Sequence, residues 1–236
     1  MRNIIVLIVI ILAINSLCSA QKQTQRTADF AVAAGNGFSP AVSVNKLWGL
    51  GPKNKFSVGV GLRFTGLYGG QRDYITAPAR LTSGKTGPQV LFVESILSNL
   101  DTLSLTQTAV GYINIPIYLQ YSFSKKFEIG LNIDALGLGF GGKQSGRFSA
   151  KESKSLNNTI QSAKPTAFNL LLVSDNDLGS LNSEIYARYW INNKIGIRAG
   201  LSFQFVEYTT ERLLTFENDR FRSKNLLPMF ALSYKL

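Results

Sequence analysis

The stretch that decides the fold runs from Gly111 to Gly142 and reads GYINIPIYLQYSFSKKFEIGLNIDALGLGFGG. Apolar and polar residues alternate along both of its halves, which are separated by a short polar turn, Ser124-Lys125-Lys126. A period of two is that of a β-strand, because successive side chains of a strand point to opposite faces. The stretch therefore predicts a hairpin of two antiparallel strands, with one apolar face and one face that carries carboxylates and amides.

Alternation of the same kind recurs along the rest of the chain. Together with the hairpin it predicts eight strands, at Asp29–Ala34, Pro40–Trp48, Phe56–Tyr68, Ile113–Phe123, Phe127–Ala135, Asn182–Ile191, Ile195–Tyr208 and Leu226–Leu236. The connections are of two kinds. The tight ones are Gly51–Asn54, Ser124–Lys126 and Asn192–Lys194, and the long ones are Gly69–Gln107, Lys143–Gly179 and Glu211–Arg222.

These two kinds of connection alternate strictly if the turn Gly35-Asn36-Gly37 is counted with the long loops. Short turns at one end and long loops at the other are typical of outer-membrane barrels, which have an even number of strands from about 8 upward. We therefore expect an all-β fold, an eight-stranded antiparallel transmembrane β-barrel with short periplasmic turns and long outer loops. Both ends of the barrel domain are then expected on the periplasmic side.

Two segments within the long connections leave alternatives open. Val93–Leu100 has apolar residues at helical spacing, which permits a short helix that packs on the barrel rim or acts as a lid or plug. Thr166–Val173 is apolar enough to be a strand or a strand extension. An independent barrel strand at Thr166–Val173 would break the alternation of tight and long connections.

The chemistry of the two strand faces separates a membrane barrel from a soluble one, which would bury its apolar face. The apolar face is almost purely Ile, Leu, Val and Phe, with Lys46 as its one charge. The polar face mixes glycines with large charged groups, a combination that suits the interior of a narrow barrel. Its charged members are predicted to form a structural ion network in the lumen; they are Arg63, Glu128, Asp134, Glu184, Arg188 and Arg198.

The first 20 residues differ from the rest of the chain. Arg2 precedes an apolar run, Ile4–Ile14, and the small residues Ser19-Ala20 follow it. This pattern is typical of a secretory signal peptide, and the run is shorter than the approximately 20 residues of a spanning helix. We therefore expect a signal peptide at 1–20 and an outer-membrane barrel domain at 21–236. Cys18 lacks the small preceding residues expected of a lipid anchor.

Composition excludes several kinds of chemistry. The chain has no histidine and one cysteine, Cys18, so Ser-His hydrolysis, histidine metal sites and disulfides are not expected in the mature domain. Gly137–Gly142 matches a dinucleotide-binding pattern, but it ends a strand and enters a polar loop, so it indicates a bend at the barrel rim. We expect no enzyme activity, no cofactor and no metal.

The chain is basic, with a formal net charge of +11. For an exported protein this charge favours anionic lipid or polysaccharide over nucleic acid. The long loops are candidates for contact with outer-membrane lipid and lipopolysaccharide phosphates through Arg72, Arg80, Lys85, Lys143, Arg147, Lys151, Lys154 and Lys164.

Three stretches, NIPIYLQYSFSKKFEIGLNIDALGLGFGG, SLNSEIYARYWINNK and FENDRFRSK, resemble the outer-membrane β-barrel proteins of Bacteroidetes-type bacteria, a group that includes PorT-like proteins. The resemblance covers most of residues 28–236 and implies a Gram-negative outer-membrane location; it supplies no functional residue. We expect a monomeric, non-enzymatic barrel with a filled lumen, structural or surface-binding. The alternatives are an accessory of protein secretion or envelope transport with partner proteins, a small channel, and a lipid-modifying enzyme, which the absence of histidine disfavours.

Overall fold

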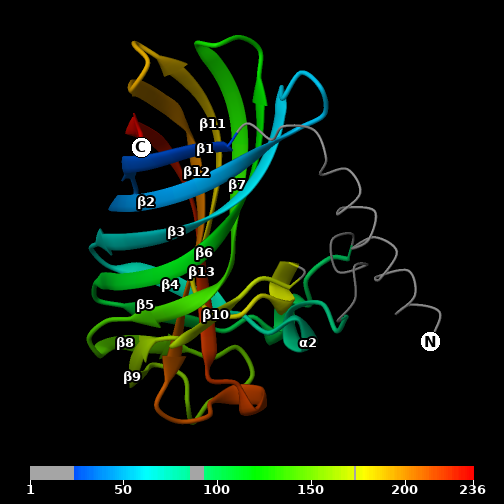
Figure 1. Cartoon of the computed structure of the whole chain (residues 1–236). Helices are drawn as coiled ribbons and strands as arrows, with labels where there is room; N and C mark the ends of the chain where they lie inside the picture. The colour runs from blue at the N-terminus through cyan, green and yellow to red at the C-terminus, as the bar shows by residue number, and fades with distance from the viewer. Residues whose placement is uncertain (1–23, 86–92, 173) are drawn as a thin grey trace, which may run out of the picture.

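The computed structural model describes residues 24–85, 93–172 and 174–236 (Figure 1). The predicted signal peptide at 1–20 lies outside these residues. Eight long strands dominate the described chain: β1 (Thr24–Gly35), β2 (Gly37–Leu50), β3 (Phe56–Gly69), β6 (Thr108–Ser122), β7 (Phe127–Phe140), β11 (Leu181–Trp190), β12 (Ile195–Thr210) and β13 (Arg220–Lys235).

The eight long strands close into a ring in the order β1-β2-β3-β6-β7-β11-β12-β13, and β13 pairs with β1. Every pairing in the ring is antiparallel. The hairpin predicted from Gly111–Gly142 is confirmed as β6 and β7, which pair from Gly111↔Phe140 to Ser122↔Glu128. Each of the other predicted strands also lies within or largely within one long strand of the ring.

The tight turns gather at one end of the ring. Backbone hydrogen bonds join neighbouring turns there, from Ser122 N to Lys55 O at 2.7 Å and from Trp190 N to Lys126 O at 2.8 Å. The start of β1 and the end of β13 lie at the same end, where Leu236 N donates to Arg26 O at 3.0 Å. We call this the short-turn end; the long connections emerge at the opposite, outer end (Figure 1).

The predicted count of eight strands is wrong, because the sheet in the described residues has thirteen. Five short strands lie in connections expected to be loops: β4 (Arg72–Thr76), β5 (Thr102–Leu105), β8 (Gln144–Ser149), β9 (Thr159–Pro165) and β10 (Phe168–Leu170). Four of these, β4, β5, β8 and β9, join the outer ends of β12 and β13 in a second, smaller ring. These strands are too short to show a clear period of two, and most of them pair with residues far away in the sequence, so alternation does not predict them.

Other details of the long connections also differ from expectation. A helix over Val93–Leu100 is wrong, since the chain there forms only a one-turn 3-10 helix, η2 (Leu97–Asn99), and a short helix, α2 (Ala79–Thr82), lies upstream. Within Thr166–Val173, β10 pairs with the outer part of β7 but is not a member of the main ring. The segment Glu211–Arg222 is shorter than a long loop, because β12 continues to Thr210 and β13 begins at Arg220, with η4 (Thr215–Glu217) between them.

The polarity of the sheet inverts along the strands that the two rings share. On β12 the inward row is Arg198, Ser202 and Gln204 in the main ring and then Val206 and Tyr208 in the small ring. The small ring encloses an apolar core: Tyr74, Leu103, Leu105, Phe148, Ala163 and Phe221 are buried there with Val206 and Tyr208. The buried charges of the network thus lie in the main ring, whereas the small ring has an apolar interior like that of a water-soluble protein. This apolar core continues into the main ring through residues such as Leu67, Tyr112 and Met229.

The outward rows change at the same level. From Ile195 to Phe203 the outward residues of β12 are apolar, and on β13 the outward row from Leu226 to the chain end is apolar as well. Phe205 is paired with Lys224, and beyond Lys224 the outward residues of β13 are Arg222 and Arg220. A tilted strand needs about 9–11 residues to cross a bilayer. The stretch from Ile195 to Phe205 meets this length.

Candidate functional site

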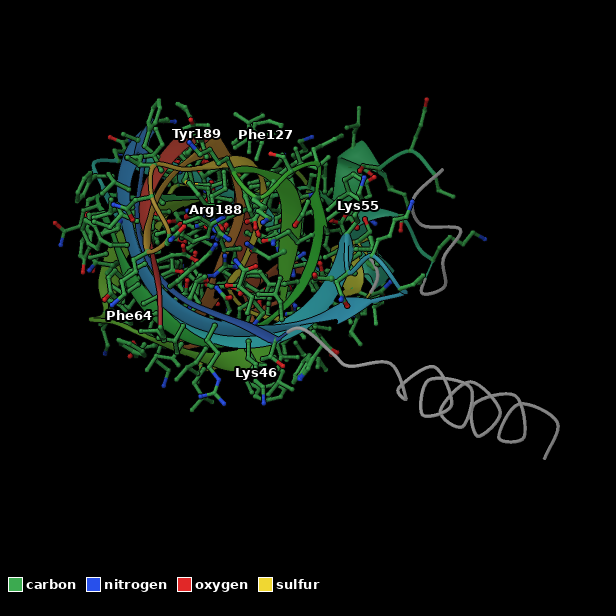
Figure 2. The ribbon with its side chains drawn as sticks, turned by 45° about the horizontal axis from the view of Figure 1, so that its top comes forward. Lys46, Lys55, Phe64, Phe127, Arg188 and Tyr189 are labelled. Atoms are coloured by element: carbon green, nitrogen blue, oxygen red, sulfur yellow. The ribbon has the colours of Figure 1, made fainter. Side chains whose placement is uncertain are left out.

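The interior of the main ring is the most chemically elaborate part of the molecule. The outside of the same ring carries a belt of exposed apolar side chains. This apolar belt includes Phe30, Val42, Leu62, Phe64, Ile113, Ile117, Leu131, Ile185, Ile197, Leu201, Phe230 and Leu232. The side chains between them in sequence point inward and are buried. Figure 2 shows Arg188 inside the ring and Phe64 and Lys46 on its outside. Lys46 lies 5.3 Å from the ring centre of Trp48, which is on the same outward row.

Toward the outer end of the main ring, an arginine of β3 connects the interior charges. Arg63 Nη2 lies 2.6 Å from Asp134 Oδ1, and Arg63 Nη1 lies 3.2 Å from Glu184 Oε1. The three side chains come from β3, β7 and β11, and each is at most 2% exposed. Asn132 lies between the charges, accepting a hydrogen bond from Arg63 at 2.7 Å and donating one to Glu184 at 2.8 Å.

The same network continues toward the short-turn end through two further arginines. Glu184 Oε2 lies 3.2 Å from Arg198 Nη2, whose other terminal nitrogen lies 3.8 Å from Asp29 Oδ2. Arg188 Nη2 lies 3.3 Å from Asp29 Oδ1, and Arg188 Nη1 lies 3.3 Å from Glu128 Oε2. Seven groups of alternating sign therefore follow one another through the interior: Asp134, Arg63, Glu184, Arg198, Asp29, Arg188 and Glu128.

Amide and hydroxyl groups supply further partners for the buried carboxylates. Asp134 accepts hydrogen bonds from Asn114 Nδ2 at 2.7 Å and from the backbone N–H of Asn182 at 2.9 Å. Asp29 accepts hydrogen bonds from Asn45 Nδ2 at 3.1 Å and from the hydroxyl of Ser233. A buried carboxylate without such partners would be costly, so these contacts explain why ionised groups persist at this depth.

Aromatic rings fill the remaining interior space beside the arginines. The Arg198 guanidinium lies 4.5 Å from the ring centre of Tyr186, and that of Arg188 lies 5.2 Å from the ring centre of Trp190. Both aromatic side chains are almost fully buried. Trp190 therefore belongs to the inward row of β11 and not to the apolar belt on the outside of the ring. Such contacts stabilise arginines that are shielded from water.

All six residues predicted for the lumen network lie in this chain of charges. Asp29 is a seventh member that the sequence interpretation missed, although it bridges Arg188 and Arg198. The signal was present, because Asp29 alternates with Phe30 and so belongs to the polar row of β1. Asn114 and Asn132 also lie on polar rows, and their role depends on contacts that no single strand reveals.

A second buried ion cluster lies at the outer end and was not predicted. Glu207 of β12 is fully buried and pairs with Arg220 and Arg222 of β13, each at 2.8 Å. Gly179 N–H also donates to Glu207, at 3.2 Å, and Arg220 donates to the carbonyl of Asp177 at 2.8 Å. This outer cluster fastens the segment after η3 (Ser174–Asn176) against the strand pair β12–β13.

The basic residues proposed for lipopolysaccharide contact differ in their burial and in the contacts they make. Arg72 is buried on the inner face of the small ring and is therefore removed from any outer binding surface. Lys143 forms an ion pair with Glu211, and Arg80 donates to the carbonyl oxygens of Phe216 and Glu217. Arg80 and Lys143 nevertheless stay exposed, as do Lys85, Arg147, Lys151, Lys154 and Lys164. Lys151 Nζ also donates to the carbonyl oxygen of Leu97, at 2.5 Å.

The described residues offer neither a cluster of metal ligands nor a membrane-spanning helix. Within residues 24–85, 93–172 and 174–236, no group of three or more His, Cys, Asp or Glu side chains is placed to hold a metal ion. The helices among the same residues are all too short or too polar to span a bilayer. The pattern Gly137–Gly142 begins within β7 and is followed by β8, not by the helix that a dinucleotide site requires.

No protein-family model matches the chain, and no curated protein matches it either. Among solved structures, the Neisserial surface protein A (NspA) is similar, with 10% identity over 90% of this chain and 96% of its own and a TM-score of 0.38. A major outer membrane protein from Thermus thermophilus has 13% identity over 91% and 100%, with a TM-score of 0.40. The outer membrane protein Ail of Yersinia pestis has 12% identity over 91% and 100%, with a TM-score of 0.37.

The class of the protein follows from the chemistry of the outside and the inside of the main ring. A closed antiparallel ring removes free strand edges, as the hydrocarbon of a bilayer demands. The exposed apolar belt and the buried ion network are the reverse of a soluble barrel and match a membrane barrel. The chain is therefore a membrane-spanning β-barrel protein with a second, water-facing ring on its outer end.

Proposed function

We propose that the protein is a non-enzymatic outer-membrane β-barrel whose lumen is filled by ion pairs and which presents its small ring at the cell surface. The observation that carries this proposal is the unbroken chain of alternating charges from Asp134 to Glu128. Its side chains are between 0% and 5% exposed, so they occupy the space through which a solute would pass. The barrel then acts as an anchor and not as a pore.

Surface binding is the role that the outer ring supports best. Arg147 and Lys164 lie on outward positions of β8 and β9, and Lys151 and Lys154 lie in the connection between these strands. Cations at this level would face the phosphates of lipopolysaccharide, for which Lys and Arg are the usual partners. Weaker binding to the protein when the lipid lacks phosphate, or at high salt, is the expected behaviour.

The finer placement in Bacteroidetes-type, PorT-like proteins, and with it a role as an accessory of secretion or envelope transport, rests on the sequence resemblance alone. Its test is a pull-down from membranes, in which recovery of secretion components would support this role. A signal peptide at 1–20 is part of the proposal, because an outer-membrane protein has to be exported.

The proposed location is tested by two measurements on the same preparation. The protein is expressed with its leader, and outer and inner membranes are separated. Folded barrels migrate differently on gels before and after boiling, so we expect a heat-dependent shift together with enrichment in the outer-membrane fraction. A water-soluble protein without a shift on heating would contradict the proposal.

A further inference from the structure

The mouth of the main ring at the short-turn end contains a cavity of about 490 Å³. It lies within the range of about 300–1,000 Å³ typical of ligand pockets. Four lysines line it: Lys53, Lys55, Lys125 and Lys235. We call this cavity the lysine cup. Figure 2, which brings this end of the barrel forward, shows Lys55, Phe127 and Tyr189 around the end and Arg188 inside the ring.

The lysine cup has a strong excess of positive charge. Glu128 is the one carboxylate among the described residues that line the cup, and Arg188 already pairs with it at 3.3 Å. The lysines come from three separate places in the chain, the β2–β3 turn, the β6–β7 turn and the end of β13. Closure of the barrel brings them around one cavity, where they attract an anion carrying more than one charge.

The position of the lysine cup points away from membrane lipid. Ser57 and Glu128 are buried on the inward rows of β3 and β7, so the cavity extends into the interior of the barrel, while Lys53 and Lys125 lie in the turns beyond the strand ends. Lipid head groups surround the barrel on the outside, where the exposed apolar belt faces the acyl chains. A head group would have to leave its leaflet to enter the cup.

The uncharged lining identifies the kind of anion. Gln25, Asn54 and Asn193 offer both amide donors and carbonyl acceptors, and Ser122 and Ser124 offer hydroxyls. The side-chain nitrogen of Gln25 is buried without a hydrogen-bond partner. Phosphate groups only accept hydrogen bonds at neutral pH, whereas a peptide presents backbone donors and acceptors beside its carboxylates. A mixed lining with lysines therefore fits an acidic peptide better than a phosphate.

We propose that the lysine cup binds an acidic polypeptide segment that reaches the barrel from its short-turn end. This inference rests on the proposed function, because in that orientation the short-turn end faces the periplasm. The barrel would then connect the cell surface to a periplasmic protein through charge complementarity, with rapid and salt-dependent association.

The test uses the folded full-length mature chain in nanodiscs of zwitterionic lipid, which leave both ends accessible. Binding of a fluorescent hexaglutamate peptide is followed by anisotropy at low and high salt. The variant K53Q/K125Q removes two cup charges in exposed turns. We expect it to weaken binding about tenfold, which corresponds to about 1.4 kcal/mol for two exposed charge pairs. The matched control K151Q/K154Q removes two charges at the outer end and should change the affinity less than about twofold.

Three results would overturn the lysine cup: equal losses in the two variants, stronger binding of inorganic polyphosphate than of hexaglutamate, or displacement of the peptide by vesicles containing anionic phospholipid. A hexaglutamine peptide should not bind. Failure of the proposed function is recognised separately, because membrane fractionation and the heat-dependent gel shift do not depend on the cup. A barrel that passes both tests but ignores hexaglutamate would refute this inference alone.

Discussion

Arg63 Nη2 lies 2.6 Å from Asp134 Oδ1, although the two residues are 71 positions apart and their strands, β3 and β7, are not neighbours in the ring. β6 lies between the two strands in the ring, so the contact runs across the inner face of β6. Side chains that reach across a barrel in this way oppose both widening and flattening of the ring. The interior charges thus determine the shape of the barrel as well as its polarity.

Replacing Arg63 by methionine should destabilise the barrel strongly. The change leaves Asp134 buried without its cation and leaves Glu184 with Arg198 alone. Breaking a buried pair on one side costs about 3–5 kcal/mol. Urea unfolding from lipid vesicles measures the loss. The double variant R63M/D134N should lose less than the sum of the single variants, because the two residues interact directly. Additive losses would show that the contact does not stabilise the barrel.

The boundary between lipid and water can be tested with one substitution at two places. Ile117 on β6 and Ile160 on β9 are both exposed, at 44% and 66%. Ile117→Arg places a charge in the apolar belt and should cost about 2–4 kcal/mol near mid-bilayer. Ile160→Arg lies on the outside of the small ring and should stay within about 0.5 kcal/mol of the wild type. Equal costs in urea unfolding from vesicles would contradict the assigned boundary.

Glu207→Gln should loosen the outer end without opening the main ring. It removes the carboxylate that pairs with Arg220 and Arg222 and accepts a hydrogen bond from Gly179. We expect faster hydrogen exchange and proteolysis in the segment around Asp177, since the two arginines lose a buried partner. Glu211→Gln is the control, because its pair with Lys143 is exposed and contributes less than about 1 kcal/mol. Unchanged protection in Glu207→Gln would exclude a fastening role.

The filled interior predicts that the wild-type barrel does not conduct. An eight-stranded ring is just wide enough for side chains to fill, and here seven charged groups occupy it. Planar-bilayer recording of the purified protein should therefore show no large, stable conductance. A porin reconstituted in the same way serves as the positive control. Stable openings that depend on the presence of this protein would refute the filled lumen.

Asp177 should make stability at the outer end depend on pH. Burial raises the pKa of Asp177 above its ordinary value of 3.8, and Asp175 and Glu207 add to this, while the Leu172 N–H and Arg222 oppose it. The folded state therefore holds the proton more tightly than the unfolded state. The protonated Asp177 carboxyl therefore adds to the free energy of unfolding. This contribution is fully present below pH 3.8 and is lost as the pH rises through the raised pKa of Asp177.

The variant Asp177→Asn isolates this effect. It retains an acceptor for the N–H of Leu172, which lies 2.7 Å from Asp177 Oδ1, but it cannot ionise. We expect the difference in unfolding free energy between wild type and variant to change with pH in the acidic range. Parallel stability curves from acid to neutral pH would show that Asp177 keeps an ordinary pKa.

Alternation of residue types predicted all eight members of the main ring, because each strand carries its own signal. Ile113 and Ile117 need no knowledge of the partner strand to be recognised as one apolar row. The small ring carried no such signal. Its strands are as short as Thr102–Leu105, and they are ordered by pairing with residues distant in sequence, such as Leu103 with Phe148.

The candidate site shows the same division. The polar rows identified Arg63, Glu128, Asp134, Glu184, Arg188 and Arg198 as interior groups, since side-chain direction along a strand follows from its period of two. Their pairing did not follow, because it depends on which strands close the ring and at what register. For that reason the sequence did not identify Asp29 as the bridge between Arg188 and Arg198. It did not identify Glu207 either, because Glu207 lies on the outward row of β12 and is buried there by the segment after η3.

By itself, then, the sequence determined the strand period, the two chemical faces and the alternation of tight and long connections, because all three are local properties of the chain. Only the tertiary structure decided that β12 and β13 belong to two rings, that the charges form one continuous chain, and that four lysines surround one cavity. The physical reason is ring closure, which brings residues together by register and not by sequence distance. The hairpin of Gly111–Gly142 illustrates this division. The sequence predicted its apolar and polar faces, but not which residues of β3 and β11 lie beside them.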